Sequence, residues 1–391
     1  MPTNLVTSTR MIAATDTLAA IQPILPDYDI YGFAEHSLVG VESIRSIEVF
    51  RGEPRSGYLN LGKGFGFEAA LVSGYMEAIE VCTVETVPQV AVTTLSHLDP
   101  NALIYTAVKK QAVLASSLPD DAANSAMICG VDLLTAAPVY GFVSENFLPD
   151  EDVGDVLHVS TNGLASGNSL VEARLHALYE LIERHVTALS LQSMGQVLFM
   201  DLRDIPSPLC EAIAELNASG WRCEFFLLGR MLGVVVIQCA LSPIEACATE
   251  RLEVSFGWGA HHELLIAMAR AIAEAVQGNA TRSACQQDSI PPERMRGGML
   301  LSGEQLAMLK TGASAGERIL LQRLRASTRF IVSLEAASDD ILVAPSTALA
   351  QLVTSAREAG ISHLFSWTLS PPERPFSVVK CVVPEFKTLF S

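Results

Sequence analysis

Three glycine-containing stretches, each running directly into a long helical segment, constrain the fold of this chain most strongly. They are GKGFGFEAALVSGYMEAIE (62–80), STNGLASGNSLVEARLHALYELIERH (160–185) and GWGAHHELLIAMARAIAEAVQ (257–277). We interpret the glycine-containing part of each as a loop and the remainder as a helix, because apolar residues recur at helical spacing after the glycines. Strand-like segments alternate with these and other helices, which predicts a mixed α/β fold.

The rest of the chain carries further helix and strand patterns. The segment 221–241 is typical of a β-hairpin, and Gly360 is expected to end a helix over 345–360. The other expected elements are short helices at 16–25 and 302–327, a strand at 43–52, strands with a turn over 125–144, and strands at 362–369 and 376–383.

Charge and cysteine usage narrow the class of protein. The formal net charge of −17 argues against binding to nucleic acid or to an anionic membrane, because both need basic surface. The N-terminal MPTNLVTSTR has no apolar signal region, and Arg230 interrupts the most apolar stretch, 225–242. The eight cysteines show no paired spacing, so we expect a reduced, cytoplasmic protein without a zinc site or disulfides.

Glutamates share one face on two of the helices. At about 100° per residue, Glu180 and Glu183 lie about 80° and about 20° from Glu172, and Glu77 and Glu80 are three positions apart. Like charges on one face destabilise a helix unless a cation neutralises them, and Mg²⁺ prefers carboxylate oxygens. Leu175, Leu178 and Ile182 occupy other positions, where they can pack.

Each glutamate also has an ordinary structural interpretation. Glu172 stands three positions after Ser169, as in a capping box, and Arg184 can pair with Glu180. Arg270 and Glu274 are spaced like a helix ion pair, although an arginine aimed at a phosphate fits the same spacing. The spacing alone leaves these alternatives open.

Familiar nucleotide, nucleophile and zinc motifs are missing. GKGFG matches neither the P-loop nor the dinucleotide-binding pattern, and the sequence contains no GxSxG or HExxH. Zinc at His261 and His262 is disfavoured because adjacent residues rarely ligate one metal. We interpret His176 and His185 as helix surface or core residues.

Taken together, the three stretches resemble the YcaO family. The second stretch is similar to the family's S-x-G-x-A-x-G-N loop and E-(x7)-E-x-x-E-R helix, the first to its GKG…MEAIE segment, and the third to its G-x-G-x-H…RA-x-x-EA-x-Q segment. The resemblance covers nearly the whole chain. It implies a single domain over 1–391, with an N-terminal part (1–155), ATP-binding helices at 60–90, 160–190 and 260–285, and a C-terminal part (300–391).

The resemblance also implies the cofactors ATP and Mg²⁺ and a set of site residues. By position, Mg²⁺ would be held by Glu77, Glu80, Glu180 and Glu183. The residues that would contact or stabilise ATP are Arg10, Thr17, Asn168, Glu172, Arg184, Arg270 and Glu274. Arg10 stands where the family has a lysine.

Enzymes of this family activate a backbone amide of a ribosomally made peptide. A nucleophile adds to the amide carbon, ATP phosphorylates the resulting oxygen, and phosphate leaves. A neighbouring Cys, Ser or Thr gives an azoline, whereas external sulfide gives a thioamide. The chain ends in VVKCVVPEFKTLFS, without the proline-rich tail of azoline-forming relatives. It therefore resembles members that form thioamides with a TfuA-like partner.

The implied partners are a precursor peptide, a TfuA-like or other protein, and a second copy of the chain in a homodimer. Three other functions stay open. The first is a non-catalytic scaffold that keeps the ATP site. The second is a different ATP-using ligase, and the third is a module whose acidic face binds a basic leader peptide. The segment SACQQD and the ending VPEF depart from the family pattern and affect the substrate side more than the ATP side.

Overall fold

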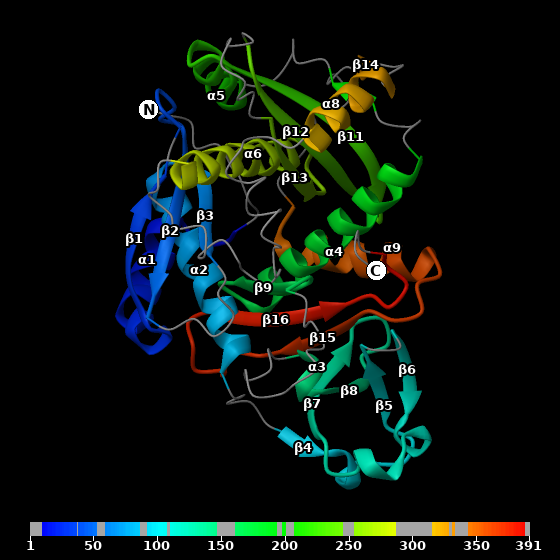
Figure 1. The fold of residues 1–391 in the computed structure, drawn as a ribbon. Coiled ribbons are helices and arrows are strands. Elements are labelled where there is room, and N and C mark those ends of the chain that lie inside the picture. Colours follow the sequence, from blue (N-terminus) through cyan, green and yellow to red (C-terminus); the bar gives the residue numbers. More distant parts are fainter. Residues whose placement is uncertain are drawn as a thin grey trace.

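Helices and strands alternate along the chain, as the interleaved pattern predicts. The structure is a computed structural model. The residues it describes are 10–36, 38–52, 59–86, 92–107, 110–146, 161–193, 198–200, 207–244, 254–286, 315–327, 331–332 and 343–387. The described strands form three sheets, with a five-stranded sheet at the top of Figure 1, a three-stranded sheet at the left and an eight-stranded sheet at the bottom.

The three-stranded sheet is antiparallel and lies near the N-terminus. Its order is β1 (Ile30–Glu35), β2 (Ile44–Arg51), β3 (Asn60–Phe65), so the strand expected at 43–52 is confirmed. Helix α1 (Ala14–Ile21) and a 3₁₀ helix, η1 (Gln22–Tyr28), precede it. Helix α2 (Phe67–Glu85) follows β3 and packs back against it.

The five-stranded sheet has the order β13-β12-β11-β10-β14. Its strands are β10 (Leu198–Met200), β11 (Trp221–Met231), β12 (Val234–Pro243), β13 (Ser255–His261) and β14 (Ile331–Val332). The hairpin expected at 221–241 is the antiparallel pair β11–β12, which turns through Leu232 and Gly233, both with positive φ. Helices α5 (Ser207–Ala218) and α6 (Leu264–Gln286) contact this sheet, and α8 (Ala315–Ser327) forms the described part of the helix expected at 302–327.

The eight-stranded sheet joins the middle of the chain to its C-terminal part. Its path is β6-β5-β8-β7-β15-β16-β9, with β4 beside β7. The bounds are β4 (Val92–Thr94), β5 (Leu103–Thr106), β6 (Gln111–Leu114), β7 (Ala126–Asp132), β8 (Pro138–Phe142), β9 (Leu164–Gly167), β15 (Phe365–Thr368) and β16 (Ser377–Val382). Short helices η2 (Leu95–His97), η3 (Ala115–Ser117), η4 (Asp120–Ala122) and α3 (Val143–Asn146) connect some of these strands.

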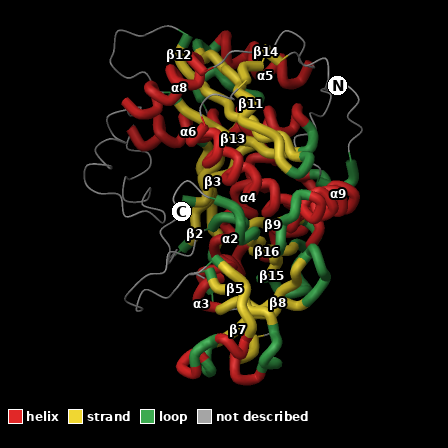
Figure 2. The backbone as a smooth tube through the Cα atoms, turned by 90° about the vertical axis from the view of Figure 1, so that its right-hand side faces the viewer, coloured by secondary structure: helices red, strands yellow, loops and turns green. Residues whose placement is uncertain are grey.

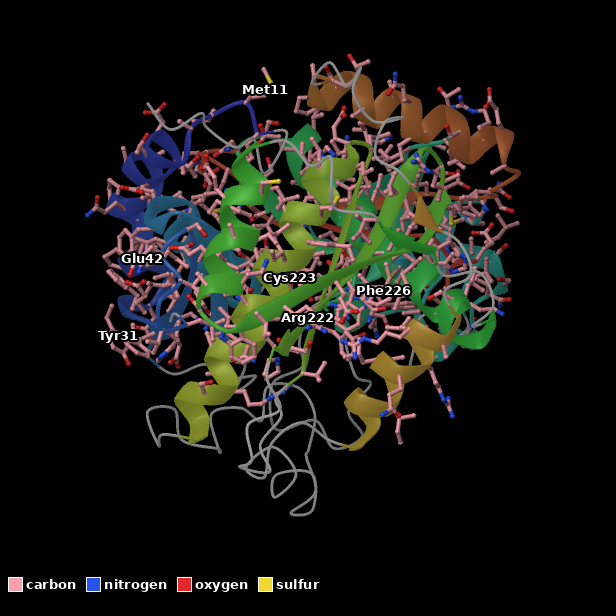
Figure 3. All side chains as sticks on the ribbon, turned by 90° about the horizontal axis from the view of Figure 1, so that it is seen from above. Met11, Tyr31, Glu42, Arg222, Cys223 and Phe226 are labelled. Atoms are coloured by element: carbon pink, nitrogen blue, oxygen red, sulfur yellow. The ribbon has the colours of Figure 1, made fainter. Side chains whose placement is uncertain are left out.

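Helix α4 (Leu170–Ser193) occupies the centre of the molecule. Figure 2 shows it between β13 on one side and β9 and β16 on the other, and it contacts all three strands. Leu175, Leu178 and Ile182 are each at most 2% exposed and join a core cluster with Phe226 of β11 and Leu352 of α9 (Pro345–Glu358). Figure 3 shows Phe226 well inside the outline of the molecule, whereas Tyr31 lies at its margin. The apolar face of α4 therefore packs in the hydrophobic core.

Most of the glycines that precede these helices lie in strands and not in loops, which corrects the prediction in part; Gly66 and Gly163, both with positive φ, do lie in a bend and a turn. Gly62 and Gly64 lie in β3, Gly167 ends β9, and Gly257 and Gly259 lie in β13. A Cβ on Gly62 would stand 2.1 Å from the carbonyl oxygen of Ala70, and one on Gly259 would stand 2.0 Å from that of Ala267. Glycine is needed there because each helix folds back onto the strand that precedes it, closer than any side chain permits.

The C-terminal elements agree with the sequence pattern. Helix α9 ends before Gly360, whose φ is +75°, as a glycine C-cap requires. The strands expected at 362–369 and 376–383 are β15 and β16. Among the described residues, no helix combines the length and the apolar character that crossing a membrane requires.

Candidate active site

Five glutamates of helices α2, α4 and α6 lie close enough for their charges to act on one another. They are called the carboxylate cluster and are Glu77, Glu80, Glu180, Glu183 and Glu274. The charges of Glu180 and Glu274 act on Glu77, the charges of Glu77 and Glu180 act on Glu80, and the charge of Glu274 acts on Glu183. The structure thus brings together carboxylates that the sequence places almost 200 positions apart.

The carboxylate cluster is unfavourable for negative charge. Burial, together with the charges of neighbouring carboxylates, raises the pKa of Glu77 to about 7 and that of Glu80 to about 8. Burial and the charge of Glu274 raise the pKa of Glu183 to about 7, and burial raises the pKa of Glu180. A bound cation would relieve such repulsion, and a group of strongly perturbed carboxyls is a typical mark of a functional site.

Hydrogen bonds from two strands orient the α2 carboxylates. The Leu61 N–H of β3 donates to Oε1 of Glu77 at 3.1 Å. The N–H and the hydroxyl of Ser166, in β9, donate to Oε1 of Glu80 at 2.7 and 2.5 Å. Both carboxylates are therefore anchored through one oxygen by the strands on either side of α2.

Basic side chains face the carboxylate cluster. Nζ of Lys63, in β3, lies 2.8 Å from Oε2 of Glu274, and Nη2 of Arg184 lies 3.4 Å from Oε1 of Glu180. The positive charge of Arg270 acts on Glu180 and Glu183, the two glutamates of α4 in the cluster. The Glu180–Arg184 pair expected from the helix spacing is present, whereas Glu274 forms an ion pair with Lys63 of another element.

A buried lysine, Lys380, interacts with Glu180 through its charge. Lys380 of β16 is 7% exposed, and its Nζ donates to the carbonyl oxygen of Asn162 at 2.7 Å. Burial lowers the pKa of Lys380 to about 8, and the charge of Glu180 opposes that shift. Lys380 in turn holds the pKa of Glu180 below the value that burial alone would give.

Unlike the other glutamates of α4, Glu172 accepts hydrogen bonds from the N-terminal segment and from Asn168. Its Oε1 accepts from the N–H of Met11 at 2.7 Å, and its Oε2 accepts from the N–H and the side-chain amide of Asn168 at 3.0 and 3.2 Å. The Oδ1 of Asn168 accepts from the hydroxyl of Thr17 at 2.9 Å. Met11, whose side chain projects from the rim in Figure 3, is thereby tied by its backbone to the start of α4.

This arrangement modifies the capping box expected at Ser169. The Ser169 hydroxyl accepts from the N–H of Glu172 at 3.2 Å, as predicted. The Glu172 carboxylate accepts from Asn168 and Met11, so the N-terminal segment takes part in the cap. Arg10, next to Met11, comes close enough for its charge to interact with Glu172, Glu80 and Arg270, although the residue is exposed overall.

The residues expected at the site thus form two adjoining groups. Arg10, Thr17, Asn168 and Glu172 lie at the start of α4, and the carboxylate cluster with Arg184 and Arg270 lies further along it. The sequence analysis missed Lys63, Ser166 and Lys380. Lys63 stands inside the GKG motif, so its signal was present but was assigned to a loop, whereas nothing in the sequence marks Lys380.

The donor set fits Mg²⁺ in its chemistry. Among the described ranges, no three His, Cys, Asp or Glu side chains are close enough to form a complete metal-ligand set. Magnesium commonly takes only one or two protein carboxylates and completes its shell with water and phosphate oxygens. Carboxylates with raised pKa beside arginine and lysine suit a magnesium ion that is shared with a polyphosphate.

Comparison with known proteins identifies the family. The model of the YcaO family, described as an ATP- and Mg²⁺-binding cyclodehydratase, matches residues 61–387. The chain belongs to the YcaO family. ATP and Mg²⁺ are therefore its cofactors, and the family places it among ATP-dependent, cyclodehydratase-like enzymes of peptide modification.

The chain is also similar to individual proteins and solved structures. The chain is 27% identical over 301 residues to an uncharacterized protein in the tfuA 3′ region of Rhizobium leguminosarum bv. trifolii, a match that covers 72% of this chain and 69% of that protein. The structure of YcaO from Methanopyrus kandleri bound with AMPPCP and Mg²⁺ is similar with a TM-score of 0.71 and 23% identity, over 98% of this chain and 93% of that one.

A heterocyclase in complex with substrate and cofactor has a TM-score of 0.73 and 18% identity, over 97% of this chain and 53% of the heterocyclase. These structural similarities confirm the mixed α/β, YcaO-type fold that the sequence predicts.

Proposed function

We propose that this chain is an ATP- and Mg²⁺-dependent enzyme that modifies a backbone amide of a ribosomally made peptide, forming a thioamide with a TfuA-like partner and a sulfur source. The observation that carries the proposal is the carboxylate cluster, in which partly buried glutamates of raised pKa from α2 and α4 face Lys63, Arg184 and Arg270. Phosphoryl transfer needs this combination of metal-binding carboxylates and cations.

The metal would be held by Glu77 and Glu80 of α2 and by Glu180 and Glu183 of α4. The Leu61 and Ser166 bonds hold one oxygen of each α2 carboxylate, which aims the other oxygen. Magnesium would supply charge neutralisation on the transferred phosphate. Lys380 would keep Glu180 ionised, because its positive charge offsets part of the cost of burying that carboxylate.

Two groups of residues would hold the nucleotide. Arg184 and Arg270 would contact phosphate oxygens, since arginine is suited to them, while Lys63 and Glu274 join β3 to α6 beside them. Arg10, Thr17, Asn168 and Glu172 would position the rest of the nucleotide through the N-terminal segment. With ATP bound, the chain's own part is to orient the phosphate chain and to exclude water from it.

The thioamide product is supported by the similarity to the relative from the tfuA 3′ region. Azoline formation from Cys, Ser or Thr is the second candidate, and the similarity to a heterocyclase supports it. A scaffold that binds ATP or a leader peptide without catalysis is the third. Such a scaffold would retain partly buried carboxylates, which are energetically unfavourable, although they would take part in no reaction.

Calorimetric titration of the full chain with ATP, with and without Mg²⁺, tests the proposed site. Magnesium-dependent binding is expected, and binding that ignores magnesium would contradict the metal role of the glutamates. Incubation with precursor peptide, Mg·ATP, the TfuA-like protein and sulfide then identifies the product by mass spectrometry. Exchange of oxygen for sulfur is the expected result, loss of water would mean azoline formation, and an unchanged peptide with intact ATP binding would favour the scaffold.

A further inference from the structure

One edge of strand β1 is open and lined with exposed aromatic side chains. In the part of the chain that the structure describes, β1 pairs with β2 alone, so its other edge has no neighbouring strand. Tyr31 is 69% exposed, Phe33 41%, and Phe67, at the start of α2, 38%. We call β1 with these three aromatic residues the aromatic edge. An exposed apolar edge strand is a template for pairing with another chain, and proteins usually block it with charge, proline or a covering element.

The pairing register shows which backbone groups of β1 face outward. The N–H of His36 donates to the carbonyl oxygen of Ser46 at 2.9 Å, and Ala34 lies opposite Glu48, two positions further along. In an antiparallel pair, hydrogen-bonded positions alternate with positions whose N–H and C=O point away from the partner strand. Phe33 stands at such a position, so its backbone N–H and C=O point to the open edge, where an added strand can bond with them.

The aromatic rings lie on both faces of this edge. Tyr31 stacks on Phe50 of β2, with 6.2 Å between the ring centroids. Phe33 contacts Phe67 and Tyr75 of α2, with centroid distances of 5.7 and 6.4 Å. By the register of β1 and β2, Phe33 and Phe50 lie on opposite faces of the sheet. An added strand, whose side chains alternate between the faces, would therefore meet aromatic rings on both sides.

Carboxylates border the aromatic edge. Glu35 ends β1, Glu42 lies in the connection from β1 to β2, and Glu68 lies in the first turn of α2; all three are exposed. Arg45 pairs with both Glu35 and Glu42, so these four residues together carry a negative charge. Figure 3 shows Glu42 and Tyr31 along the same margin of the molecule. The charge therefore suits a segment that carries Lys or Arg beside apolar residues.

We propose that the aromatic edge binds an extended segment of the peptide substrate, basic and apolar in composition, as a strand added to β1; this inference rests on the proposed function. The backbone of the segment would bond with Phe33, its apolar side chains would pack on the three aromatic residues, and its cations would face Glu35 and Glu68. A ribosomally made peptide without a fold of its own can supply such a strand. A second copy of the chain fits less well, because it would bring the same carboxylates, and a net charge of −17, against this edge.

The aromatic edge is joined to the proposed active site through α2. Phe67 and Tyr75, which contact Phe33, belong to the helix that carries Glu77 and Glu80. A segment held at β1 would thus be bound to the same packed unit as the α2 carboxylates. Binding there would raise the effective concentration of the rest of the peptide at the site.

Fluorescence anisotropy with synthetic peptides tests this surface without ATP. The probe is fluorescein-labelled KKVFVTVKK. Its matched controls are EEVFVTVEE, which reverses the charge, and KKVFPTVKK, in which proline removes a backbone donor from the strand. We expect saturable binding of the probe to the full chain and binding at least about tenfold weaker for each control. Equal binding of the three peptides would overturn the inference.

Hydrogen exchange and two variants locate the bound probe. Addition of a strand should slow amide exchange within 30–36, because the N–H of Phe33 becomes hydrogen-bonded. Tyr31→Ser removes an exposed ring and should weaken probe binding by at least about threefold, and Phe33→Lys, which adds a like charge, should weaken it by at least about tenfold. Leu114→Ser is the matched control, since Leu114 is an exposed apolar residue of β6, and should bind the probe like the wild type.

The outcomes keep this inference separate from the proposed function. Unchanged exchange within 30–36 at saturating probe, or probe binding that Tyr31→Ser and Phe33→Lys leave unaltered, would overturn the inference. A wild-type dimer that becomes monomeric in Phe33→Lys and binds no probe would assign the edge to a second copy instead. Absence of Mg·ATP binding in calorimetry would refute the proposed function, whereas probe binding, which is measured without nucleotide, reports on the aromatic edge alone.

Discussion

Lys63 of β3 and Glu274 of α6, which are 211 positions apart in the chain, form an ion pair with 2.8 Å between Nζ and Oε2. The pair joins the first glycine-containing stretch to the third at the edge of the carboxylate cluster. Each side chain is 30% exposed, so the pair contributes little to stability by itself. The charges of both residues act on Glu183, at the proposed ligand site.

Removal of the Lys63 charge should weaken nucleotide binding more than it weakens the fold. We expect Lys63→Met to raise the Kd for Mg·ATP by about tenfold, about 1.4 kcal/mol, and to change the free energy of unfolding by less than about 1 kcal/mol. Calorimetry and urea unfolding measure the two quantities. Lys63→Arg keeps the charge and should lie between the variant and the wild type, whereas equal losses of affinity and stability would point to a structural role.

Isosteric replacement of the α4 carboxylates should abolish magnesium-dependent binding. Gln at Glu180 or Glu183 keeps the size but cannot neutralise a metal, so the Kd for Mg·ATP should rise by at least about a hundredfold. The matched control is Glu68→Gln, because Glu68 lies exposed in the first turn of α2. If the α4 variants bind Mg·ATP like the control, these glutamates are not magnesium ligands.

Replacement of the α2 carboxylate Glu80 should stabilise the metal-free fold. Burial raises the pKa of Glu80 from 4.5 to about 8, so ionised Glu80 destabilises the metal-free fold, and the penalty grows as pH rises from about 4.5 to about 8 and then levels off. Glu80→Gln keeps an acceptor for Ser166 and should raise the free energy of unfolding at pH 8.5 by about 1 kcal/mol, reduced from the full shift by partial exposure. Thermal unfolding without Mg²⁺ measures this, and a destabilised variant would show that Glu80 is not strained.

His261 should make the fold sensitive to acid. Burial and Arg270 lower its pKa to about 3, below the ordinary value of 6.5, so the unfolded chain binds this proton more readily than the folded one. The resulting stability is fully present above pH 6.5 and is lost as pH falls toward 3, at up to about 1.4 kcal/mol per pH unit. His261→Gln should flatten this dependence between pH 6.5 and 5. Because both proteins share the glutamate titrations, the difference between their curves isolates His261, and parallel curves would contradict the prediction.

The close packing of α6 on β13 should tolerate no side chain at Gly259. A Cβ there would meet the carbonyl oxygen of Ala267 at 2.0 Å, so Gly259→Ala should lower the free energy of unfolding by at least about 2 kcal/mol. Gly278 is the control on α6, since a Cβ there would find its nearest neighbour at 3.9 Å. Gly278→Ala should be neutral or stabilising by up to about 1 kcal/mol, because glycine is unfavourable within a helix. Urea unfolding of the two variants compares them, and equal stability would refute the packing argument.

Helix and strand types were largely readable from the sequence because they depend on local periodicity. The apolar spacing of α4 identified Leu175, Leu178 and Ile182 as packing residues, and all three are buried. Most glycines of the three stretches were misread as loop residues because glycine usually marks turns. In β3 and β13 it instead permits a helix to lie against its own strand, a contact that depends on the fold and not on local preference.

For the site, the amino-acid pattern alone predicts which face of each helix carries glutamates and, through three motifs in order, the family and its cofactors. Tertiary structure decided what those faces meet. It set Lys63 against Glu274, placed the buried Lys380 near Glu180, joined Met11 and Asn168 to Glu172, and surrounded His176 with cations. Charge interactions and burial act through space, so the pKa of a side chain depends on neighbours hundreds of residues away, and no local pattern encodes them.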